Sequence, residues 1–249
     1  MKLKNKIALV TGAQRGIGKA TAEVLAEAGA TVVVNFLDDE NAANEIVKNI
    51  IHGGGKAVTA QGDVTKKEQV DSIMNITEEL GGIDILVNNA GVFPRKELFE
   101  INGEDWDYVH DINLKACFFC AQAAAAKMVQ SNKNGSIVNI ASISAYDGPA
   151  RGIHYAASKG GLISMTRALA MSLSNNSIRV NAIAPGLTDT AQPRDGHSEA
   201  EIKEMGNSLP LGRIIQPVEV AQSVLFLVSD QANQITGQVL HINGGTLII

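Results

Sequence analysis

Short apolar strands alternate with helical segments along almost the whole chain, and this alternation limits the possible folds more than any other feature. Strands are predicted at Lys6–Thr11, Thr31–Phe36, Lys56–Gln61, Asp84–Asn88, Ser136–Ile140, Arg179–Ala184 and Gln238–Ile242. Apolar residues recur at helical spacing in Ile17–Ala28, Glu40–Ile51, Lys66–Leu80, Glu104–Val129, Tyr155–Leu173 and Pro217–Leu227. Several strands are apolar almost throughout, which is typical of a parallel sheet covered on both faces. We therefore predict an α/β fold, a doubly wound parallel sheet of about seven strands with helices on both faces.

One segment interrupts the alternation. Residues 1–249 carry the predicted elements without a Pro- or Ser-rich linker, so we expect a single domain. Thr188–Arg213, by contrast, is polar and contains Pro193, Pro210 and several glycines. A long irregular segment in a compact α/β domain is often functional. We predict that residues 188–213 form a lid, the least ordered part of the ligand-free protein.

Charge and hydropathy exclude several classes of protein. The net charge is -5, and nucleic-acid binding requires clustered Lys and Arg. Met1–Lys6 is basic, but the apolar run Ile7–Val10 is too short for a secretory signal. No apolar stretch approaches the roughly 18 residues that a membrane span needs. We expect a cytoplasmic protein that binds neither nucleic acid nor membrane.

Two cysteines, Cys117 and Cys120, form a CxxC pattern inside the predicted helix Glu104–Val129. Tetrahedral zinc needs further ligands, and the sequence has no second CxxC or HxxxH. Positions i and i+3 share one helix face, where Cys packs as a small apolar residue. We interpret both cysteines as packing residues and expect no metal site.

A glycine cluster follows the first predicted strand. Thr11-Gly12-Ala13-Gln14-Arg15-Gly16-Ile17-Gly18 opens the helix behind it. Glycines let the backbone turn tightly and approach a pyrophosphate, and the helix N-terminus supplies unpaired N–H groups. In this position the cluster predicts a dinucleotide-binding loop. Its GxxxGxG spacing differs from the common GxGxxG pattern.

Three more motifs follow in order. Asn88-Asn89-Ala90-Gly91 comes after the fourth strand, Tyr155-x-x-x-Lys159 opens a helix, and Pro185-Gly186 comes after the sixth strand. With TGxxxGIG they resemble the short-chain dehydrogenase/reductase family over essentially the whole chain. The resemblance implies a Rossmann fold and an NAD(P)(H)-dependent oxidoreductase that interconverts a carbonyl and an alcohol. The helices Glu104–Val129 and Tyr155–Leu173 are apolar over more surface than one sheet face can cover. With the resemblance, this predicts a homotetramer assembled through these two helices, with a dimer as the second choice.

The resemblance assigns four catalytic residues: Asn113, Ser142, Tyr155 and Lys159. Tyr155 and Lys159 stand one helical turn apart, and a Lys cation about 4 Å from a phenolate stabilises it by about 4 kcal/mol at an effective dielectric of 20. Tyr155 would transfer the proton, and the Ser142 hydroxyl would hold the substrate oxygen, with Ser144 a weaker candidate. Asn113 would hold a water with Lys159.

The cofactor-binding positions come from the same motifs. We predict contacts at Gly12, Gln14, Arg15, Gly16, Ile17, Gly18, Asn35, Phe36, Asp63, Val64, Asn89, Ala90, Gly91, Tyr155, Lys159, Pro185, Gly186, Thr188 and Thr190. By resemblance the Asp63 carboxylate faces the adenine, although it can also cap the next helix. Thr188–Thr190 would run along the nicotinamide.

The choice between NAD(H) and NADP(H) depends on the end of the second strand. NAD enzymes usually place an acid there, and this chain has Asn35 and Phe36. Arg15 can pair with a 2′-phosphate, while Asp38, Asp39 and Glu40 would repel one if they point inward. We predict NADP(H) over NAD(H).

We favour a carbonyl reductase or alcohol dehydrogenase acting on a small ketone or secondary alcohol. The alternatives are a 3-oxoacyl-acyl-carrier-protein reductase, a glucose 1-dehydrogenase-like enzyme and, from another class, a non-catalytic NADP-sensing regulator. The carrier protein is acidic and needs exposed cations near the site. Met171–Ser177 at the end of the catalytic helix has none, which leaves Lys127 and Lys133.

Overall fold

A computed structural model describes residues 2–249, and Met1 of the basic N-terminal segment lies outside the described residues. The strands are β1 (Ile7–Val10), β2 (Thr31–Phe36), β3 (Lys56–Gln61), β4 (Ile85–Asn88), β5 (Ser136–Ile140), β6 (Arg179–Pro185) and β7 (Val239–Ile242). They form one parallel sheet in the order β3-β2-β1-β4-β5-β6-β7. The order reverses between β1 and β4, which defines the predicted doubly wound fold.

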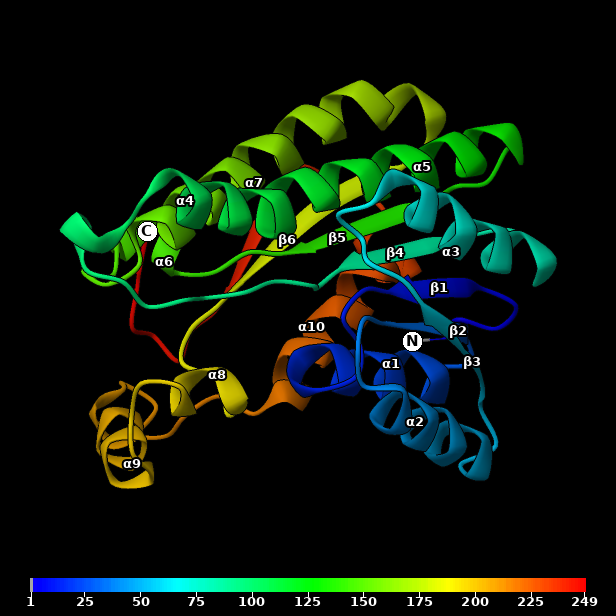
Figure 1. Ribbon diagram of the computed structural model, residues 1–249. Coiled ribbons are helices and arrows are strands. Elements are labelled where there is room, and N and C mark those ends of the chain that lie inside the picture. The colour runs from blue at the N-terminus through cyan, green and yellow to red at the C-terminus, as the bar shows by residue number, and fades with distance from the viewer. Residues whose placement is uncertain (1) are drawn as a thin grey trace.

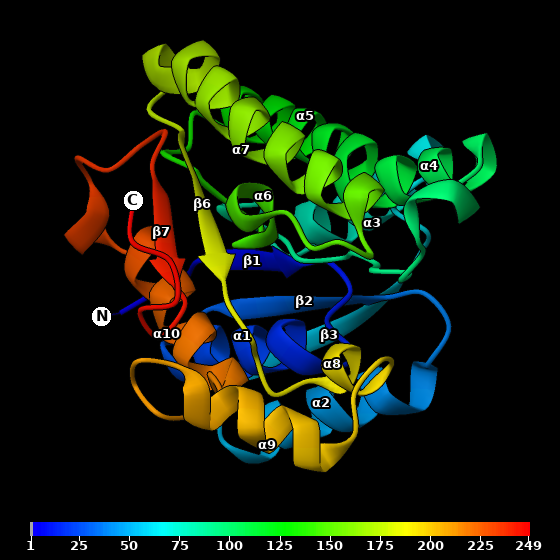
Figure 2. The same ribbon diagram turned by 90° about the vertical axis from the view of Figure 1, so that its left-hand side faces the viewer.

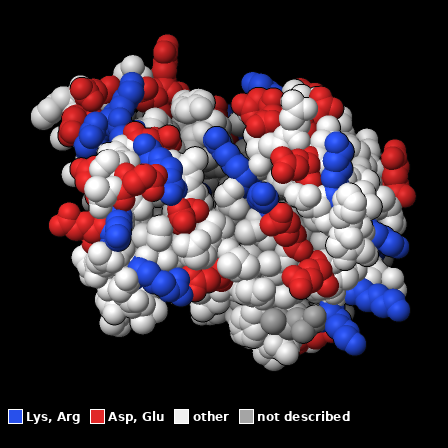
Figure 3. Space-filling model, turned by 90° about the horizontal axis from the view of Figure 1, so that it is seen from below, with Lys and Arg blue, Asp and Glu red and all other residues white. Residues whose placement is uncertain are grey.

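Helices cover both faces of the sheet. The α-helices are α1 (Gly16–Glu27), α2 (Glu40–His52), α3 (Lys67–Glu79), α4 (Gly103–His110), α5 (Ala116–Gln130), α6 (Ser144–Asp147), α7 (Ile153–Leu173), α8 (Ala191–Arg194), α9 (Glu199–Ser208) and α10 (Pro217–Val228). Short 3-10 turns lie at Leu98–Glu100, Ser174–Asn176 and Asp230–Ala232. Figure 1 shows α3, α5 and α7 on one face and α1, α2 and α10 on the other. Figure 3 shows acidic and basic side chains intermingled on the latter side.

Alternate residues of the central strands enter two separate cores. Ala8 and Val10 of β1 pack in the core under α1, α2 and α10, whereas Leu9 packs in the core under α3 and α5. All three are fully buried. Because side chains alternate across a strand, a strand buried on both faces must be apolar at every position. This explains the continuous apolar runs in the sequence.

The segment predicted as one helix, Glu104–Val129, is divided in the structure. Asn102 begins α4 with a capping box, in which Asp105 is the reciprocal partner. A π-helical turn at Asp111–Lys115 then separates α4 from α5. The sequence does not reveal the π-turn, because one extra residue shifts the apolar pattern by only a single position, which is hard to distinguish from an uninterrupted helix.

The expectation of an irregular segment at 188–213 is wrong in its detail, because two helices lie within it. Ser198 begins α9 with a capping box to Glu201, and α8 precedes it. Figure 2 shows both helices beyond the carboxyl end of β6, outside the two layers that cover the sheet. No helix within residues 2–249 has both the length and the apolar character needed to cross a membrane.

Candidate active site

The glycine loop lies at the point where the strand order reverses. Gly12 has a φ of 58°, which favours glycine, and a Cβ atom there would lie 2.9 Å from the Cα atom of Ala90. The amide nitrogen of Ala13 donates to the carbonyl oxygen of Asn35 at 2.7 Å. The loop is thus held between the ends of β2 and β4, and the backbone N–H groups at the start of α1 suit a pyrophosphate.

Thr11 and Asn89 fix the loop from the side of β4. The hydroxyl oxygen of Thr11 accepts hydrogen bonds from the amide nitrogens of Asn89 and Ala90, at 3.0 and 3.1 Å. The Asn89 side chain donates to the carbonyl oxygens of Thr11 and Gly12. The side chain of Asn89 is therefore committed to the glycine loop, and the expected contacts of Asn89, Ala90 and Gly91 with the cofactor stay predictions.

The side chains of Asn35 and Phe36 are engaged within the protein, and the predicted contact of these two residues with the cofactor stays a prediction. The Asn35 amide accepts from the Gly12 nitrogen at 3.2 Å and donates to the carbonyls of Ala60 and Gly62. Phe36 is 3% exposed and belongs to the core. A short amide at the end of β2 meets the hydrogen-bonding needs of the backbone that surrounds it.

Asp63 and Val64 follow β3. One carboxylate oxygen of Asp63 accepts from both the backbone nitrogen and the hydroxyl of Thr65, at 2.9 and 2.7 Å. Asp63 thereby forms the turn that precedes α3, and Val64 is buried beside it. The expected contact of the Asp63 carboxylate with the adenine stays a prediction.

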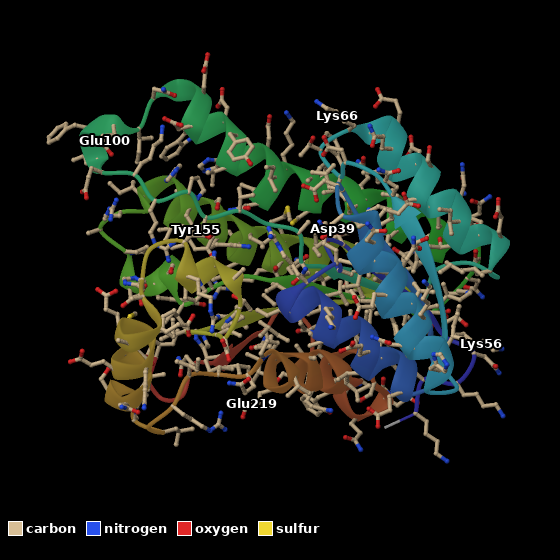
Figure 4. All side chains as sticks on the ribbon, turned by 60° about the horizontal axis from the view of Figure 1, so that its bottom comes forward. Asp39, Lys56, Lys66, Glu100, Tyr155 and Glu219 are labelled. Atoms are coloured by element: carbon tan, nitrogen blue, oxygen red, sulfur yellow. The ribbon has the colours of Figure 1, made fainter. Side chains whose placement is uncertain are left out.

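Tyr155 and Lys159 lie one turn apart near the N-terminal end of α7, and both are nearly buried. The ammonium nitrogen of Lys159 is 5.8 Å from the Tyr155 ring centroid and donates to the Ile140 carbonyl at 2.8 Å. The Phe93 ring packs on Tyr155, with 4.2 Å between centroids. Sequence reasoning missed Phe93, because no motif marks the residues after Gly91. Figure 4 shows Tyr155 at the end of the sheet near which α8 and α9 lie.

Asn113 is fully buried in the π-helical turn. Its side chain donates to the Val92 carbonyl at 2.9 Å and accepts from the Val92 amide at 2.8 Å. A Cβ atom on Gly91 would lie 3.2 Å from the Asn113 amide oxygen and 3.5 Å from the Lys159 nitrogen. Asn113 and Lys159 thus approach the same glycine, and the water expected between them stays a prediction.

Ser142 follows the end of β5 and is 8% exposed. Its hydroxyl oxygen accepts a hydrogen bond from the Ser144 amide at 3.1 Å, which begins the short helix α6. Ser142 thus lies within three residues of Ile140, whose carbonyl receives the Lys159 ammonium. This local turn brings Ser142 to the end of the sheet where Lys159 and Tyr155 lie, whereas Ser144 supports the turn through its backbone.

The segment after β6 returns to the glycine loop. Thr188 donates its hydroxyl to the Gly186 carbonyl at 2.9 Å and is buried, so this side chain stabilises its own turn. Thr190 reaches farther, since a Cβ atom on Gly16 would lie 3.3 Å from the Thr190 methyl carbon. Thr190 therefore lies against the glycine loop, and the predicted contacts of Pro185, Gly186, Thr188 and Thr190 with the cofactor stay predictions.

His154, which precedes Tyr155, is fully buried, and within residues 2–249 neither ring nitrogen has a hydrogen-bond partner. Burial is the main reason why the pKa of His154 is lowered; Asp105 opposes this shift, while His110 and Lys96 add to it. The sequence interpretation, a packing or surface residue, did not predict that the ring would be buried without a partner.

Cys117 and Cys120 are buried in α5, as expected for packing residues. Burial raises the pKa of the Cys117 thiol to about 11, and its sulfur donates to the Asn113 carbonyl at 3.4 Å. Such a thiol is unreactive near neutral pH. Among residues 2–249 no group of three or more His, Cys, Asp or Glu side chains could hold a metal ion.

Comparison with known proteins agrees with this geometry. Residues 12–246 match the family model described as "Enoyl-(Acyl carrier protein) reductase". The structure superposes with a TM-score of 0.93 on a short-chain type dehydrogenase/reductase from Mycobacterium marinum, which is 35% identical, with 100% of this chain and 98% of that chain covered. The chain belongs to the short-chain dehydrogenase/reductase family and is an NAD(P)-dependent oxidoreductase that acts on a CH–OH group or the corresponding carbonyl.

Two curated relatives are more specific. The 3-oxoacyl-[acyl-carrier-protein] reductase FabG of Thermotoga maritima is 40% identical over 249 residues, which is 100% of both chains. The 3-oxoacyl-[acyl-carrier-protein] reductase of a Synechocystis species is 39% identical over 248 residues, 99% of this chain and 98% of the relative.

These relatives overturn the sequence-based preference for a carbonyl reductase or alcohol dehydrogenase of small ketones, which is wrong. The four motifs serve the cofactor and the proton transfer, which the whole family shares, so they do not separate one carbonyl substrate from another. The absence of a cation in Met171–Ser177 therefore does not exclude similarity to a carrier-protein reductase.

Proposed function

We propose that this chain is a 3-oxoacyl-[acyl-carrier-protein] reductase, which uses NADPH to convert a 3-oxoacyl thioester into the 3-hydroxyacyl thioester. The observation that carries the proposal is the agreement with 3-oxoacyl-[acyl-carrier-protein] reductases at 36–40% identity over 96–100% of the chain. The similarity covers nearly the whole length of the chain and is not confined to one motif.

The proton transfer is assigned to Tyr155. When bound, NADPH supplies the hydride. Ser142 donates a hydrogen bond to the substrate oxygen as negative charge develops on it, and the Tyr155 hydroxyl gives that oxygen a proton. Lys159 stabilises the phenolate that remains, because its ammonium group is held near the ring by the Ile140 carbonyl. Asn113 and Lys159 then return a proton from solvent.

NADPH is the proposed cofactor because Arg15 supplies an exposed guanidinium at the N-cap of α1. A guanidinium pairs with phosphate oxygens through two parallel hydrogen bonds, so this position favours a 2′-phosphate. Neither of the last two residues of β2 is an acid, and the side chains of Asn35 and Phe36 are committed to the sheet and core.

The two lysines expected to meet the carrier protein have partners in their own chain. Lys127 lies 3.8 Å from a Glu78 carboxylate oxygen. Lys133 donates to the Gly81 and Gly82 carbonyls at the end of α3 and lies 3.2 Å from Asp84. Charge on these lysines is largely compensated, and we therefore propose that carrier recognition depends mainly on the acyl thioester and its linker.

We also propose a homotetramer, a cytoplasmic location and a mobile lid at residues 188–213. Trp106, Phe118, Val129 and Met171 on α4, α5 and α7 are 39–79% exposed, and a second copy would bury them. Sedimentation equilibrium at micromolar concentration would give four times the chain mass, and a monomer mass would contradict the tetramer.

The proposed lid includes α8 and α9, which project from the sheet layers (Figure 2).

A substrate comparison tests the proposed function. Purified enzyme is given NADPH with a 3-oxobutyryl group on acyl carrier protein, on coenzyme A and on a short pantetheine analogue, and with a simple ketone. We expect kcat/KM for the carrier-linked group to exceed that for the simple ketone by at least about 10²-fold, because remote binding lowers the barrier. A higher kcat/KM for the simple ketone would contradict the proposal.

A further inference from the structure

We propose that Arg95 is a positioning residue for Tyr155: its guanidinium holds the Phe93 ring against the tyrosine and ties this pair of rings to helix α8 of the proposed lid. Arg95 lies in the segment between β4 and α4. The inference rests on the proposed proton transfer by Tyr155, and it adds a residue through which lid movement reaches that tyrosine.

The Phe93 ring is packed tightly against the start of α7. Its centroid lies 4.2 Å from the centroid of the Tyr155 ring, with 32° between the two ring planes. A Cβ atom on Gly152, the residue that precedes α7, would overlap the Phe93 ring. Because closely packed side chains transmit strain, the position of the Phe93 ring limits the positions that the Tyr155 ring can take.

Arg95 contacts both the Phe93 ring and the lid. Its guanidinium carbon lies 4.8 Å from the Phe93 ring centroid, which is within the range of a cation–π interaction, and the side chain is half-buried. The same guanidinium donates a hydrogen bond to the Gln192 carbonyl of α8 at 3.1 Å. A Cβ atom on Gly196 would lie 2.8 Å from the Arg95 side chain. One side chain thus joins the two rings to α8 and to the turn after it.

The lid segment that Arg95 contacts is braced by a second arginine, Arg194 of α8. The Arg194 guanidinium lies 2.9 Å from an Asp189 carboxylate oxygen and 2.6 Å from a Glu199 carboxylate oxygen. It also donates to the Thr190 carbonyl at 2.6 Å. These contacts join α8 to the residues before it and to the start of α9, so we expect α8 to move together with both neighbours.

Helix α8 therefore connects the glycine loop with the two rings. Thr190, which precedes α8, lies against Gly16 of the glycine loop. Arg95 contacts α8 from the segment after β4. A lid that closes over the glycine loop would hold Arg95 in place and, through the Phe93 ring, the catalytic tyrosine.

Hydrogen exchange of the enzyme saturated with NADPH tests the contact with the lid. Arg95→Met keeps an apolar stem and removes the guanidinium. Amides of residues 191–197 should exchange about fivefold faster, because opening the lid no longer breaks a hydrogen bond and a cation–π contact. Arg151→Met is the control: Arg151 is exposed and pairs with Glu97 at 3.0 Å, so its loss should change lid exchange less than about twofold.

Fluorine NMR tests the step from Arg95 to Tyr155. The enzyme is labelled with 3-fluorotyrosine, and the Tyr155 signal is assigned by its absence in Tyr155→Phe. Phe93→Leu removes the neighbouring ring and shows how far the signal moves when that contact is lost. We expect Arg95→Met to move the Tyr155 signal in the same direction and by at least about half as much, while Arg151→Met leaves it in place.

Turnover shows whether the arginine acts through the ring. With 3-oxobutyryl acyl carrier protein, kcat should fall about fivefold in Arg95→Met, and the double variant with Phe93→Leu should be no slower than Phe93→Leu alone. Thermal unfolding checks that each variant is folded, and Arg95→Leu replaces Arg95→Met if the latter does not fold.

Three results would overturn the inference: an unmoved Tyr155 signal in a folded Arg95 variant, equal changes of lid exchange in the Arg95 and Arg151 variants, or a double variant slower than both single variants. Wild-type enzyme that does not reduce the carrier-linked group would contradict the proposed function alone, because lid exchange and the Tyr155 signal are measured without substrate.

Discussion

The ammonium nitrogen of Lys159 lies 5.8 Å from the centroid of the Tyr155 ring, held there by its hydrogen bond to the Ile140 carbonyl at 2.8 Å. Lys159→Met keeps the length of the stem and removes the charge that stabilises the phenolate. We predict that kcat falls by at least about 10² in steady-state assays with NADPH. Lys127→Met, which removes a surface cation of α5, is the control. A folded Lys159→Met enzyme with kcat near that of wild type would show that the charge has no catalytic role.

Arg15 is the residue that the proposal expects to favour NADPH, so its removal tests the cofactor assignment. If its guanidinium pairs with the 2′-phosphate, Arg15→Ala should weaken NADPH binding by about 1.5–3 kcal/mol and leave NADH binding nearly unchanged. Fluorescence titration of the two cofactors measures both values. Equal weakening of NADPH and NADH would mean that Arg15 supports the loop and does not recognise the phosphate.

The sheet could be predicted well because its signal is local. Ile7–Val10 and Thr31–Phe36 are apolar or β-branched at nearly every position, and such short runs are typical of buried parallel strands. The start of α9 also has a local signal, the capping box Ser198-x-x-Glu201, which the interpretation of 188–213 as irregular overlooked.

The parts of the site that escaped prediction depend on tertiary contacts. The sequence does not reveal that Asn35 bonds three backbone groups from other segments or that Phe93 packs on Tyr155. The π-turn at Asn113 and the buried ring of His154 likewise depend on how α4 and α7 pack. Substrate identity escaped for another reason, since the shared motifs serve only cofactor binding and proton transfer.

The burial of the His154 ring should make the free energy of unfolding depend on pH. Burial lowers the pKa of the folded-state imidazole below its ordinary value of 6.5, so below pH 6.5 the unfolded chain binds a proton that the folded chain does not. The contribution of the neutral His154 ring to the free energy of unfolding is therefore fully present above pH 6.5 and is lost as the pH falls below that value. Each proton adds a slope of at most about 1.4 kcal/mol per pH unit.

Urea unfolding between pH 7 and pH 5 measures this slope. His154→Phe should unfold with a shallower loss of stability than wild type on acidification. His52→Gln, at an exposed histidine at the end of α2, is the control. An identical slope in His154→Phe would mean that the ring is protonated in the folded protein.

If residues 188–213 form a mobile lid, their amide hydrogens should exchange faster than those of the central strands. In the protein without ligand, amides of residues 190–210 should exchange much faster than those of β4 and β5, because α8 and α9 are short and lie outside the sheet layers (Figure 2). NADPH and substrate together should slow this exchange. Slow exchange across residues 190–210 before any ligand is added would indicate a fixed wall.

The central claim is that Tyr155 gives a proton to the carbonyl oxygen of a carrier-linked 3-oxoacyl group as NADPH reduces it. The most direct measurement uses 3-oxobutyryl acyl carrier protein and NADPH labelled with deuterium at the transferred position, with the product followed by mass spectrometry. We predict that wild-type enzyme adds one deuterium and one proton to the acyl group. Tyr155→Phe should bind NADPH normally but form product at least about 10² more slowly. An unreduced acyl group with wild-type enzyme, or near-normal turnover in a folded Tyr155→Phe variant, would contradict the account.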